Sequence, residues 1–299
     1  MAKECLCIDV GGSAIKYALI DDTRTISEHG QVPTPYDGIP AYLAALTDLY
    51  RQFAEKIEGI ALSVPGIIDS ENGVCITGGA LKFIENFPLV TELQKTCPVP
   101  IAVMNDAKSA ALAESKQGAL ADCQDGIVLI LGTGIGGALV KDGQVHMGKH
   151  FSAGEFSFIT LSENVDQGAC NWAGVNGNPR LIGMVANVKK LDPKKLTGHD
   201  VFRWAGEGDE KVLMVLDQFT RNLARMIFNL QVIFDPERVA IGGGISRQPL
   251  LLEYIRRNLD YFYDLNPMYF PKAEVVTCKF FNEANLIGAY ENLRMRMDF

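Results

Sequence analysis

The stretch IVLILGTGIGGALVKD, residues 127–142, does most to define the fold class. Its apolar first part predicts a buried strand. A glycine-rich turn then leads into a second strand and a hairpin turn at Asp142-Gly143. The first turn matches the G-x-G-x-x-G pattern of dinucleotide sites, but in those sites the pattern opens a helix that receives the pyrophosphate. Because a strand follows here, we expect a phosphate-binding hairpin in which the Thr133 hydroxyl bonds a phosphate oxygen, rather than a nicotinamide or flavin site.

A second copy of this pattern lies near the N-terminus. Residues 15–22, IKYALIDD, and residues 135–142, IGGALVKD, share the form Ile-x-x-Ala-Leu-(Ile/Val)-x-Asp at an offset of 120. Each follows an apolar strand and a glycine turn that carries a hydroxyl residue, Ser13 or Thr133. These matches predict a duplicated β-hairpin unit whose two glycine turns face each other across a cleft.

Strands and helices alternate along the rest of the chain. Short apolar runs predict strands over residues 6–10, 15–20, 57–64, 101–104, 127–131, 238–241 and 274–278. Helical patterns cover residues 38–54, 107–116, 212–234, 250–262 and 285–297. The segment 162–178 is polar and glycine-rich and is predicted to be a loop. The alternation indicates an α/β protein with mixed sheets, divided by a hinge near residues 119–126.

The composition excludes several classes of protein. The chain has 299 residues, of which 47% are hydrophobic and 21% charged, and this balance excludes a mainly disordered chain or a collagen-like fibre. The net charge of −8 argues against general binding to the nucleic-acid backbone. The longest nearly apolar run, residues 127–140, is too short to span a membrane, and the N-terminus lacks the features of a signal peptide. We therefore expect a cytoplasmic protein with no nucleic-acid or membrane partner.

The seven cysteines indicate neither disulfides nor zinc. They are scattered, no CxxC pair occurs, and their number is odd. The expected state is therefore reduced and mostly buried thiols. His146 and His150 are expected to be surface residues, or residues that support a site without binding a metal, rather than metal ligands, because no third ligand occurs at a suitable spacing.

The first chemical motif is the glycine turn after the first strand, DVGGS at residues 9–13, with Lys16 just beyond it. Paired glycines allow backbone N–H groups to approach a phosphate closely. A carboxylate at a strand end, here Asp9, can bind Mg²⁺ directly or through water. The alternative is an ordinary hairpin turn with Asp9 as a cap.

Three further motifs carry polar or glycine residues at strand ends. Gly242-Gly243-Gly244 lies between a strand and a helix, where a flat group or an anion can contact the backbone. The alternative is an ordinary flexible turn. Asp106 follows a strand and can take a proton from a substrate hydroxyl, with Asn105 beside it, although a helix cap is the alternative. Glu155, after Gly154, is by itself most simply a solvated side chain.

Taken together, the order and spacing of these motifs resemble the ROK family of bacterial sugar kinases over nearly the whole chain. The resemblance rests on residues 9–13, 63–66, 105–106, 132–137, 154–155 and 242–244. It implies the duplicated actin-like ATPase (ribonuclease H-like) fold, with two lobes around a central cleft. The expected lobes are residues 1–120 joined by the closing helix 285–299, and residues 121–284.

The resemblance also implies transfer of the γ-phosphate of ATP, with Mg²⁺, to a sugar hydroxyl. It assigns Asp106 as the general base and places the sugar against Asn105, Glu155, Gly66 and Gly79. It assigns the ATP and Mg²⁺ contacts to Asp9, Gly11, Gly12, Ser13, Lys16, Gly132, Thr133, Gly134, Gly242, Gly243 and Gly244, with Asp9 near the metal and the last three at the adenosine.

Two departures from the family pattern concern the sugar pocket and zinc. Many members carry a His three residues after the Glu and then a cysteine-rich zinc cluster with a further sugar-binding Glu. Here Phe158 takes the place of the His, and only Cys170 stands in the region of the cluster, followed by Asn171 and Trp172. We therefore predict no structural zinc, with Phe158 and Trp172 offering apolar surface to a larger sugar. Members of this kind phosphorylate glucose, N-acetylmannosamine or β-glucosides.

The remaining expectations concern partners and rival functions. The chain begins directly on the phosphate strand, which leaves no room for the DNA-binding helix-turn-helix of the family's repressors. A small sugar is the expected partner, and a homodimer with a contribution from the helix 212–234 is implied by the resemblance. The main rival function is a catalytically silent sugar sensor or scaffold of the same fold, followed by a polymerising actin-like ATPase and a nicotinamide-dependent enzyme.

Overall fold

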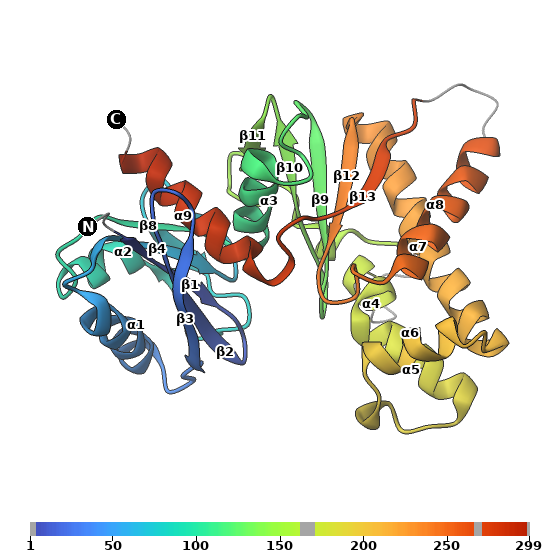
Figure 1. Cartoon of the computed structure of the whole chain (residues 1–299), viewed down its shortest axis with the longest axis horizontal. Coiled ribbons are helices and arrows are strands. Elements are labelled where there is room, and N and C mark those ends of the chain that lie inside the picture. The colour runs from blue at the N-terminus through green and yellow to red at the C-terminus, as the bar shows by residue number, and fades with distance from the viewer. Residues whose placement is uncertain (1–3, 162–170, 266–270, 298–299) are drawn as a thin grey trace. The chain divides into compact units, whose positions relative to one another are not determined.

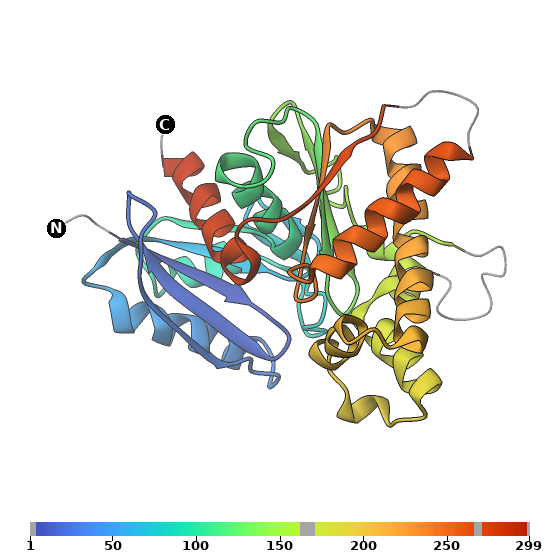
Figure 2. The same cartoon turned by 45° about the vertical axis from the view of Figure 1, so that its right-hand side comes forward.

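The computed structural model describes residues 4–161, 171–265 and 271–297, and Figures 1 and 2 show its course. The chain forms two compact units. The first comprises Met1–Lys116, Met147–Ala153 and Glu283–Phe299, and the second comprises Gln117–His146 and Gly154–Asn282. Each unit is built around its own five-stranded sheet.

The sheet of the first unit has the strand order β3-β2-β1-β4-β8. Its strands are β1 (Glu4–Val10), β2 (Ala14–Ile20), β3 (Ile26–Pro33), β4 (Ile57–Val64) and β8 (Ile101–Asn105). β1, β2 and β3 form an antiparallel meander, whereas β1, β4 and β8 run parallel. The carboxyl ends of β1, β4 and β8 therefore lie at one edge of the sheet.

Helices cover both faces of this sheet because side chains of a strand alternate between its faces. The side chains Leu6, Ile8 and Val10 of β1 share a core with helix α1 (Ile39–Phe53). On the other face, Cys5 and Cys7 share a core with helix α9 (Ala284–Met297). The unit also contains helices α2 (Leu89–Gln94) and α3 (Asp106–Gln117) and a small sheet of β5 (Ile68–Asp69), β6 (Val74–Thr77) and β7 (Glu85–Phe87).

The sheet of the second unit repeats the strand order of the first as β11-β10-β9-β12-β13. Its strands are β9 (Gly126–Leu131), β10 (Ile135–Lys141), β11 (Gln144–His146), β12 (Arg238–Gly242) and β13 (Glu274–Thr277). Here too an antiparallel meander is followed by two parallel strands. The predicted α/β class with mixed sheets is confirmed.

Helices form most of the rest of the second unit. They are α4 (Trp172–Asn176), α5 (Asn178–Lys189), α6 (Gly198–Gly206), α7 (Glu210–Phe234) and α8 (Pro249–Asp264). Single 3₁₀ turns lie at Phe156–Phe158, Pro193–Lys195 and Phe281–Glu283. The prediction of a loop over 162–178 is wrong for residues 172–176. They form α4 because the side chain of Asn171 caps the helix by accepting a hydrogen bond from the N–H of Gly174 at 3.0 Å. Residues 162–170 lie outside the described part of the chain.

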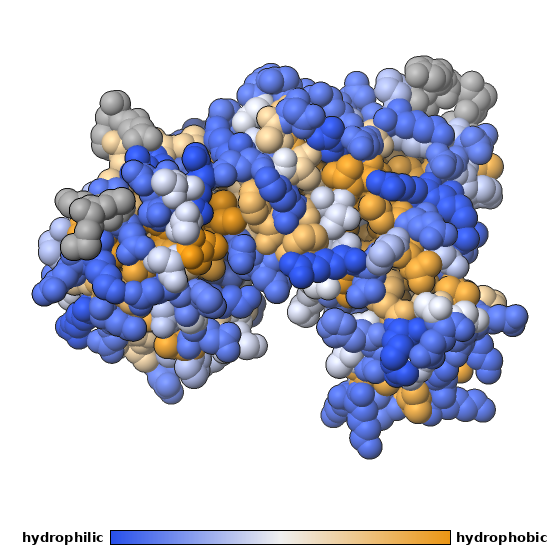
Figure 3. Space-filling model, viewed as in Figure 1, coloured by the Kyte–Doolittle hydropathy of each residue, from blue (hydrophilic) through white to orange (hydrophobic). Residues whose placement is uncertain are grey.

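Apolar side chains form a core on each face of the first sheet and one core in the second unit, and the visible surface in Figure 3 is largely hydrophilic. Within the described residues, no helix combines the length and the hydrophobicity that a membrane span requires. His146 and His150 are exposed, as predicted, and the six cysteines among the described residues are buried free thiols. Cys170 lies outside the described residues.

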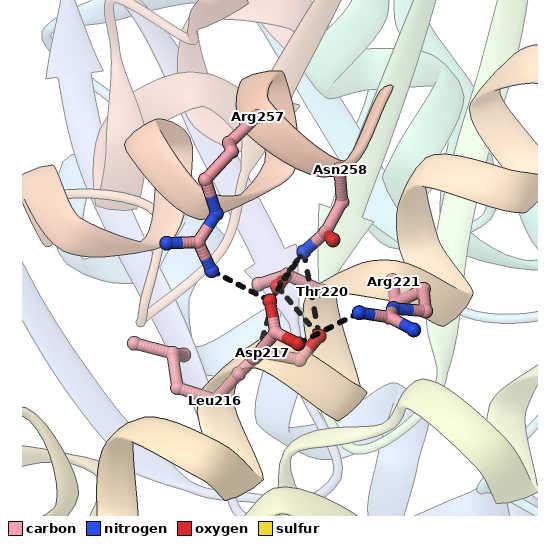
Figure 4. Close-up of polar contacts among 6 residues, drawn as sticks. All are labelled: Leu216, Asp217, Thr220, Arg221, Arg257 and Asn258. Carbon is pink, nitrogen blue, oxygen red and sulfur yellow. Dashed lines mark hydrogen bonds and ion pairs between the residues drawn. The ribbon is translucent and has the colours of Figure 1, made fainter. Parts of the chain in front are cut away.

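The packing of α7 against α8 is fixed by a charged network around Asp217 (Figure 4). Asp217 Oδ1 accepts hydrogen bonds from Arg257 Nη2 at 2.6 Å and Asn258 Nδ2 at 3.1 Å, and Oδ2 accepts one from Arg221 Nη2 at 3.1 Å. Partial burial acts to raise the pKa of Asp217. The hydrogen bonds of Asn258 and Arg257 and the charges of both arginines outweigh it, so the pKa lies below its ordinary value of 3.8.

Replacing Asp217→Asn is therefore expected to destabilise the protein by about 1–2 kcal/mol at pH 7. Because the pKa is lower in the folded state than in the unfolded state, the contribution of Asp217 is complete above about pH 4 and disappears as the pH falls through the folded value. Urea unfolding at pH 7 and pH 3 measures this. Asp48→Asn, which breaks a pair whose side chains are 69% and 68% exposed, is the control and should have little effect at either pH. An equal loss for Asp217→Asn at both pH values would contradict the assignment.

Candidate active site

The chemical motifs of the first unit follow the carboxyl ends of its three parallel strands. The register pairs Asp9 of β1 with Ser63 of β4, and Val64 of β4 with Asn105 of β8. The glycine turn after β1, the Pro65-Gly66 turn after β4 and Asp106 after β8 therefore leave the sheet at the same edge. Carboxyl ends of parallel strands are the usual location of ligand sites in α/β sheets.

Asp9 is a buried carboxylate with defined hydrogen bonds. Its side chain is 8% exposed, and its Oδ1 accepts hydrogen bonds from Ser63 Oγ at 3.0 Å and from Asn285 Nδ2 at 2.9 Å. Burial raises the pKa of Asp9, although the hydrogen bonds of Asn285 and Ser63 and the charge of Lys16 act against the rise. Lys16 lies opposite Asp9 on β2 and is exposed. The contact of Asn285 with Asp9 was not predicted from the sequence.

The donor set at Asp9 fits Mg²⁺ bound together with a nucleotide. Mg²⁺ usually takes one or two protein carboxylates and completes its shell with water and phosphate oxygens. Both hydrogen bonds to Asp9 fall on Oδ1, and Oδ2 accepts none from the described residues. Across these residues, no group of three or more His, Cys, Asp or Glu side chains is placed to hold a metal.

The glycine turn after β1 is held by residues from the segment after β3. The N–H of Gly11 donates to the carbonyl of Ala14 at 3.0 Å and closes the turn. The hydroxyl of Thr34 donates to the carbonyl of Gly11 at 2.7 Å, and the hydroxyl of Tyr36 to that of Gly12 at 2.5 Å. Gly12 and Ser13 remain exposed at the tip, as a phosphate-binding turn requires.

Asp106 is the first residue of α3 rather than a residue of the preceding strand. The helix is capped by Asn105, whose Oδ1 accepts the N–H of Lys108 at 3.1 Å, so the alternative that Asp106 serves only as the cap is not supported. Asp106 Oδ1 accepts hydrogen bonds from the N–H of Ala107 at 2.8 Å and from Asn105 Nδ2 at 2.9 Å. These two bonds from its neighbours in sequence help to orient the Asp106 carboxylate.

The turn that contains Gly66 adjoins Asn105. Asn105 Nδ2 also donates to the carbonyl of Gly66 at 2.8 Å. Gly66 has a φ of +103°, and a Cβ there would overlap the carbonyl group of Thr77 and the N–H of Gly79. The structure thereby brings together four predicted sugar-site residues of the first unit: Gly66, Gly79, Asn105 and Asp106.

In the second unit, the glycine turn after β9 is held by the start of α5. The N–H of Gly132 donates to the carbonyl of Gly134 at 3.1 Å. The N–H of Asn178 donates to the carbonyl of Gly132 at 2.8 Å, and Asn178 Nδ2 donates to the carbonyl of Leu131 at 3.1 Å. Thr133 is exposed at the tip of the turn. The supporting role of Asn178 was not predicted.

The Gly242-Gly243-Gly244 turn lies against the strand that precedes the Gly132 turn. β12 pairs with β9, and Gly243 packs against the backbone of Leu131. Gly244 opens onto a cavity of about 210 Å³. The cavity is walled mainly by apolar side chains with a few polar groups, namely Asn178, Leu181, Ile182, Gly198, His199, Phe202, Ile245 and Gln248. A cavity of this size and lining suits a flat heterocyclic base.

The family of this chain is shown by a match to the ROK family model over residues 5–294.

The chain belongs to the ROK family.

Relatives and solved structures of the family match it over nearly their whole length. A β-glucoside kinase of Klebsiella pneumoniae is 31% identical over 94% of this chain and 93% of its own. An N-acetylmannosamine kinase of Salmonella typhi is 29% identical over 95% and 96%. A ROK family protein of Streptococcus pneumoniae TIGR4, solved in complex with sucrose, has a TM-score of 0.86, 27% identity and 99% coverage of both chains. The prediction from the motifs, a sugar kinase of the ROK family, is confirmed.

One residue that we expect near the sugar, because this chain departs from the ROK pattern there, is buried in the core. Trp172 is fully buried, so the prediction that it offers surface to a sugar is wrong. Its ring packs against Phe156 with centroids 6.0 Å apart, and its Nε1 donates to Asn176 Oδ1 at 3.1 Å. These contacts make Trp172 part of the core that positions the 3₁₀ turn after Glu155.

Two other residues near this turn are accessible to solvent. Glu155 is half-buried and directly precedes the 3₁₀ turn Phe156–Phe158. Phe158, which stands where many ROK proteins carry a His, is 74% exposed. An exposed aromatic ring is available for stacking against the apolar face of a sugar.

Proposed function

We propose that this ROK-family chain transfers the γ-phosphate of ATP to a sugar hydroxyl, the 6-hydroxyl of a hexose or of a β-glucoside. The observation that carries the proposal is the hydrogen-bonded group of Asp106, Asn105 and Gly66 at the same sheet edge as Asp9 and the Gly11 turn. Such an edge supplies a proton acceptor, sugar-binding polar groups and a phosphate-binding turn. The names of the β-glucoside and N-acetylmannosamine kinases support the same chemistry.

The reaction requires one proton transfer and one displacement at phosphorus. Asp106 accepts the proton of the sugar hydroxyl as the hydroxyl oxygen bonds to the γ-phosphorus. The bond between that phosphorus and the oxygen bridging to the β-phosphate breaks, and ADP leaves. Asn105, Glu155, Gly66 and Gly79 bind the sugar in this proposal, and the turns at residues 11–13 and 132–134 bind the phosphates through backbone N–H groups.

Asp9 is the residue proposed to hold Mg²⁺, directly or through water, with Lys16 beside it. Bound Mg²⁺ would neutralise the negative charge on the phosphoryl oxygens. The adenosine is proposed to enter the cavity that Gly244 lines, with Gly242 and Gly243 in the turn that leads to it. Zinc is not part of the proposal, and the absence of a structural zinc stays a prediction.

The duplicated architecture also belongs to the proposal. The matching strand orders of the two sheets support descent from one repeated unit. The two lobes stay predictions, with residues 1–120 and 285–299 in one and residues 121–284 in the other, and so does a cleft between them. Closure around the substrate, which would exclude water that competes as the phosphoryl acceptor, is a further prediction. A cytoplasmic location, the absence of a nucleic-acid partner and a homodimer that uses α7 also stay predictions.

The function is tested by measuring ADP release from MgATP in the presence of glucose, N-acetylmannosamine, mannose, fructose or cellobiose. The sugar that stimulates release identifies the substrate. We expect strong stimulation by at least one sugar, and the exposed Phe158 and the β-glucoside kinase relative favour cellobiose. Sugar binding without ADP release would instead support the silent sensor. ATP hydrolysis that no sugar stimulates would support an actin-like ATPase.

A further inference from the structure

Two side chains from distant parts of the first unit converge on one oxygen of Asp9. Asn285 is the second residue of α9, and it reaches Asp9 Oδ1 across a sequence separation of 276 residues. Ser63 lies beside Asp9 in the parallel strand β4 and donates to the same oxygen. The resemblance to ROK proteins assigns Asp9 to the metal but gives neither donor a role.

We propose that Asn285 and Ser63 are positioning residues that hold Asp9 Oδ1, so that Oδ2 is presented to the Mg²⁺ of the bound nucleotide. This inference rests on the proposed function, in which Asp9 binds that metal. A carboxylate that already has a fixed orientation loses no further freedom when the metal binds, and this raises metal affinity.

The surroundings of Asn285 are rigid enough for such a role. α9 packs its buried residues Leu286, Ala289 and Leu293 on the sheet face that carries Cys5 and Cys7. Further along the helix, Glu291 Oε1 accepts a hydrogen bond from Arg24 Nε at 2.6 Å, which fixes α9 to the turn between β2 and β3. The amide of Asn285 therefore reaches Asp9 from a backbone that is held at several points.

A second asparagine of α9 provides a matched control. Asn292 is buried, and its Nδ2 donates to the carbonyl of Val103 in β8 at 3.3 Å. This contact also joins α9 to the sheet, but it does not involve Asp9. If Asn285 contributed only to the attachment of the helix, Asn285→Ala and Asn292→Ala would have the same consequences.

The test measures Mn²⁺ affinity by electron paramagnetic resonance titration of the ADP-bound protein. We expect Asn285→Ala and Ser63→Ala each to weaken Mn²⁺ binding about tenfold or more. ADP affinity in the presence of EDTA should remain unchanged. Asn292→Ala should lower the melting temperature but leave Mn²⁺ affinity at the wild-type value. Ser63 lies in strand β4 and not in α9, so Ser63→Ala still tests the inference if Asn285→Ala does not fold.

Asp9→Asn separates failure of this inference from failure of the proposed function. Loss of Mn²⁺ affinity in Asp9→Asn, with wild-type affinity in both Asn285→Ala and Ser63→Ala, would overturn the inference alone. Equal weakening in Asn285→Ala and Asn292→Ala would also overturn it, because it would indicate a general effect of loosening α9. Wild-type Mn²⁺ affinity in Asp9→Asn would overturn the metal role of Asp9 and the inference together.

Discussion

The Asp106→Asn variant is expected to turn over ATP with a saturating sugar about 100-fold or more slowly than the wild type. Asparagine keeps an oxygen that can accept the hydrogen bonds of Ala107 N and Asn105 Nδ2, so the start of α3 should remain intact. It cannot accept the proton of the sugar hydroxyl at neutral pH. The loss should therefore fall on kcat, with little change in the KM of either substrate.

Asp69→Asn is a suitable control for this variant. Asp69 is also a carboxylate of the first unit that accepts hydrogen bonds, from the backbone and side chain of Asn72, but it has no assigned role in the reaction. Its kcat should equal that of the wild type. A kcat within threefold of the wild type for Asp106→Asn, with both substrates saturating, would exclude Asp106 as the base.

The second large effect is expected at Gly243, where alanine should destabilise the protein by roughly 2–4 kcal/mol. Gly243 has a φ of +95°, which side chains rarely tolerate, and a Cβ there would overlap the backbone of Leu131. The substitution must therefore distort either the turn or the adjacent end of β9. Thermal unfolding of the ligand-free protein measures the effect.

The neighbouring Gly244 separates stability from nucleotide binding. A Cβ at Gly244 meets no atom within 4 Å and projects into open space beside the cavity. Gly244→Ala should therefore unfold like the wild type, within about 0.5 kcal/mol. Because the added methyl group would occupy part of the proposed adenosine site, ATP affinity should fall about tenfold. Unchanged ATP affinity by calorimetry in Gly244→Ala would count against that site.

Patterns within single segments were the most predictable part of the fold. Strand 57–64 and the long helix that ends near Pro236 are predicted with nearly the observed bounds, since the strand is mostly apolar and the helix has apolar residues three and four positions apart. The repeat was visible at an offset of 120. The structure adds that the second glycine turn is one residue shorter: Val10 pairs with Ile15, whereas Leu131 pairs with Ile135.

Contacts between distant segments were not predictable from local pattern. Asn285 looks like an ordinary polar residue near a helix start, and its partner Asp9 is at the other end of the chain. The position of Trp172 after Cys170, where other members carry the zinc cluster, suggests a place in the sugar pocket, but the side chain is buried against Phe156 and bonds Asn176. α5 contains Gly183 and Asn187, which weaken its helical signal, so tertiary packing decides its structure.

The attachment of α9 to the first sheet has a consequence for synthesis of the protein on the ribosome. The face of β1 that carries Cys5 and Cys7 is covered by residues of α9, which are translated after the whole second unit. At a translation rate of about 5–20 residues per second, on the order of 10–40 s pass between the synthesis of β8 and the synthesis of α9. During that interval its apolar face is exposed to solvent in the nascent chain. We therefore expect chaperone binding to ribosome-bound chains to begin once β8 emerges and to end only when α9 has emerged and packed on this face.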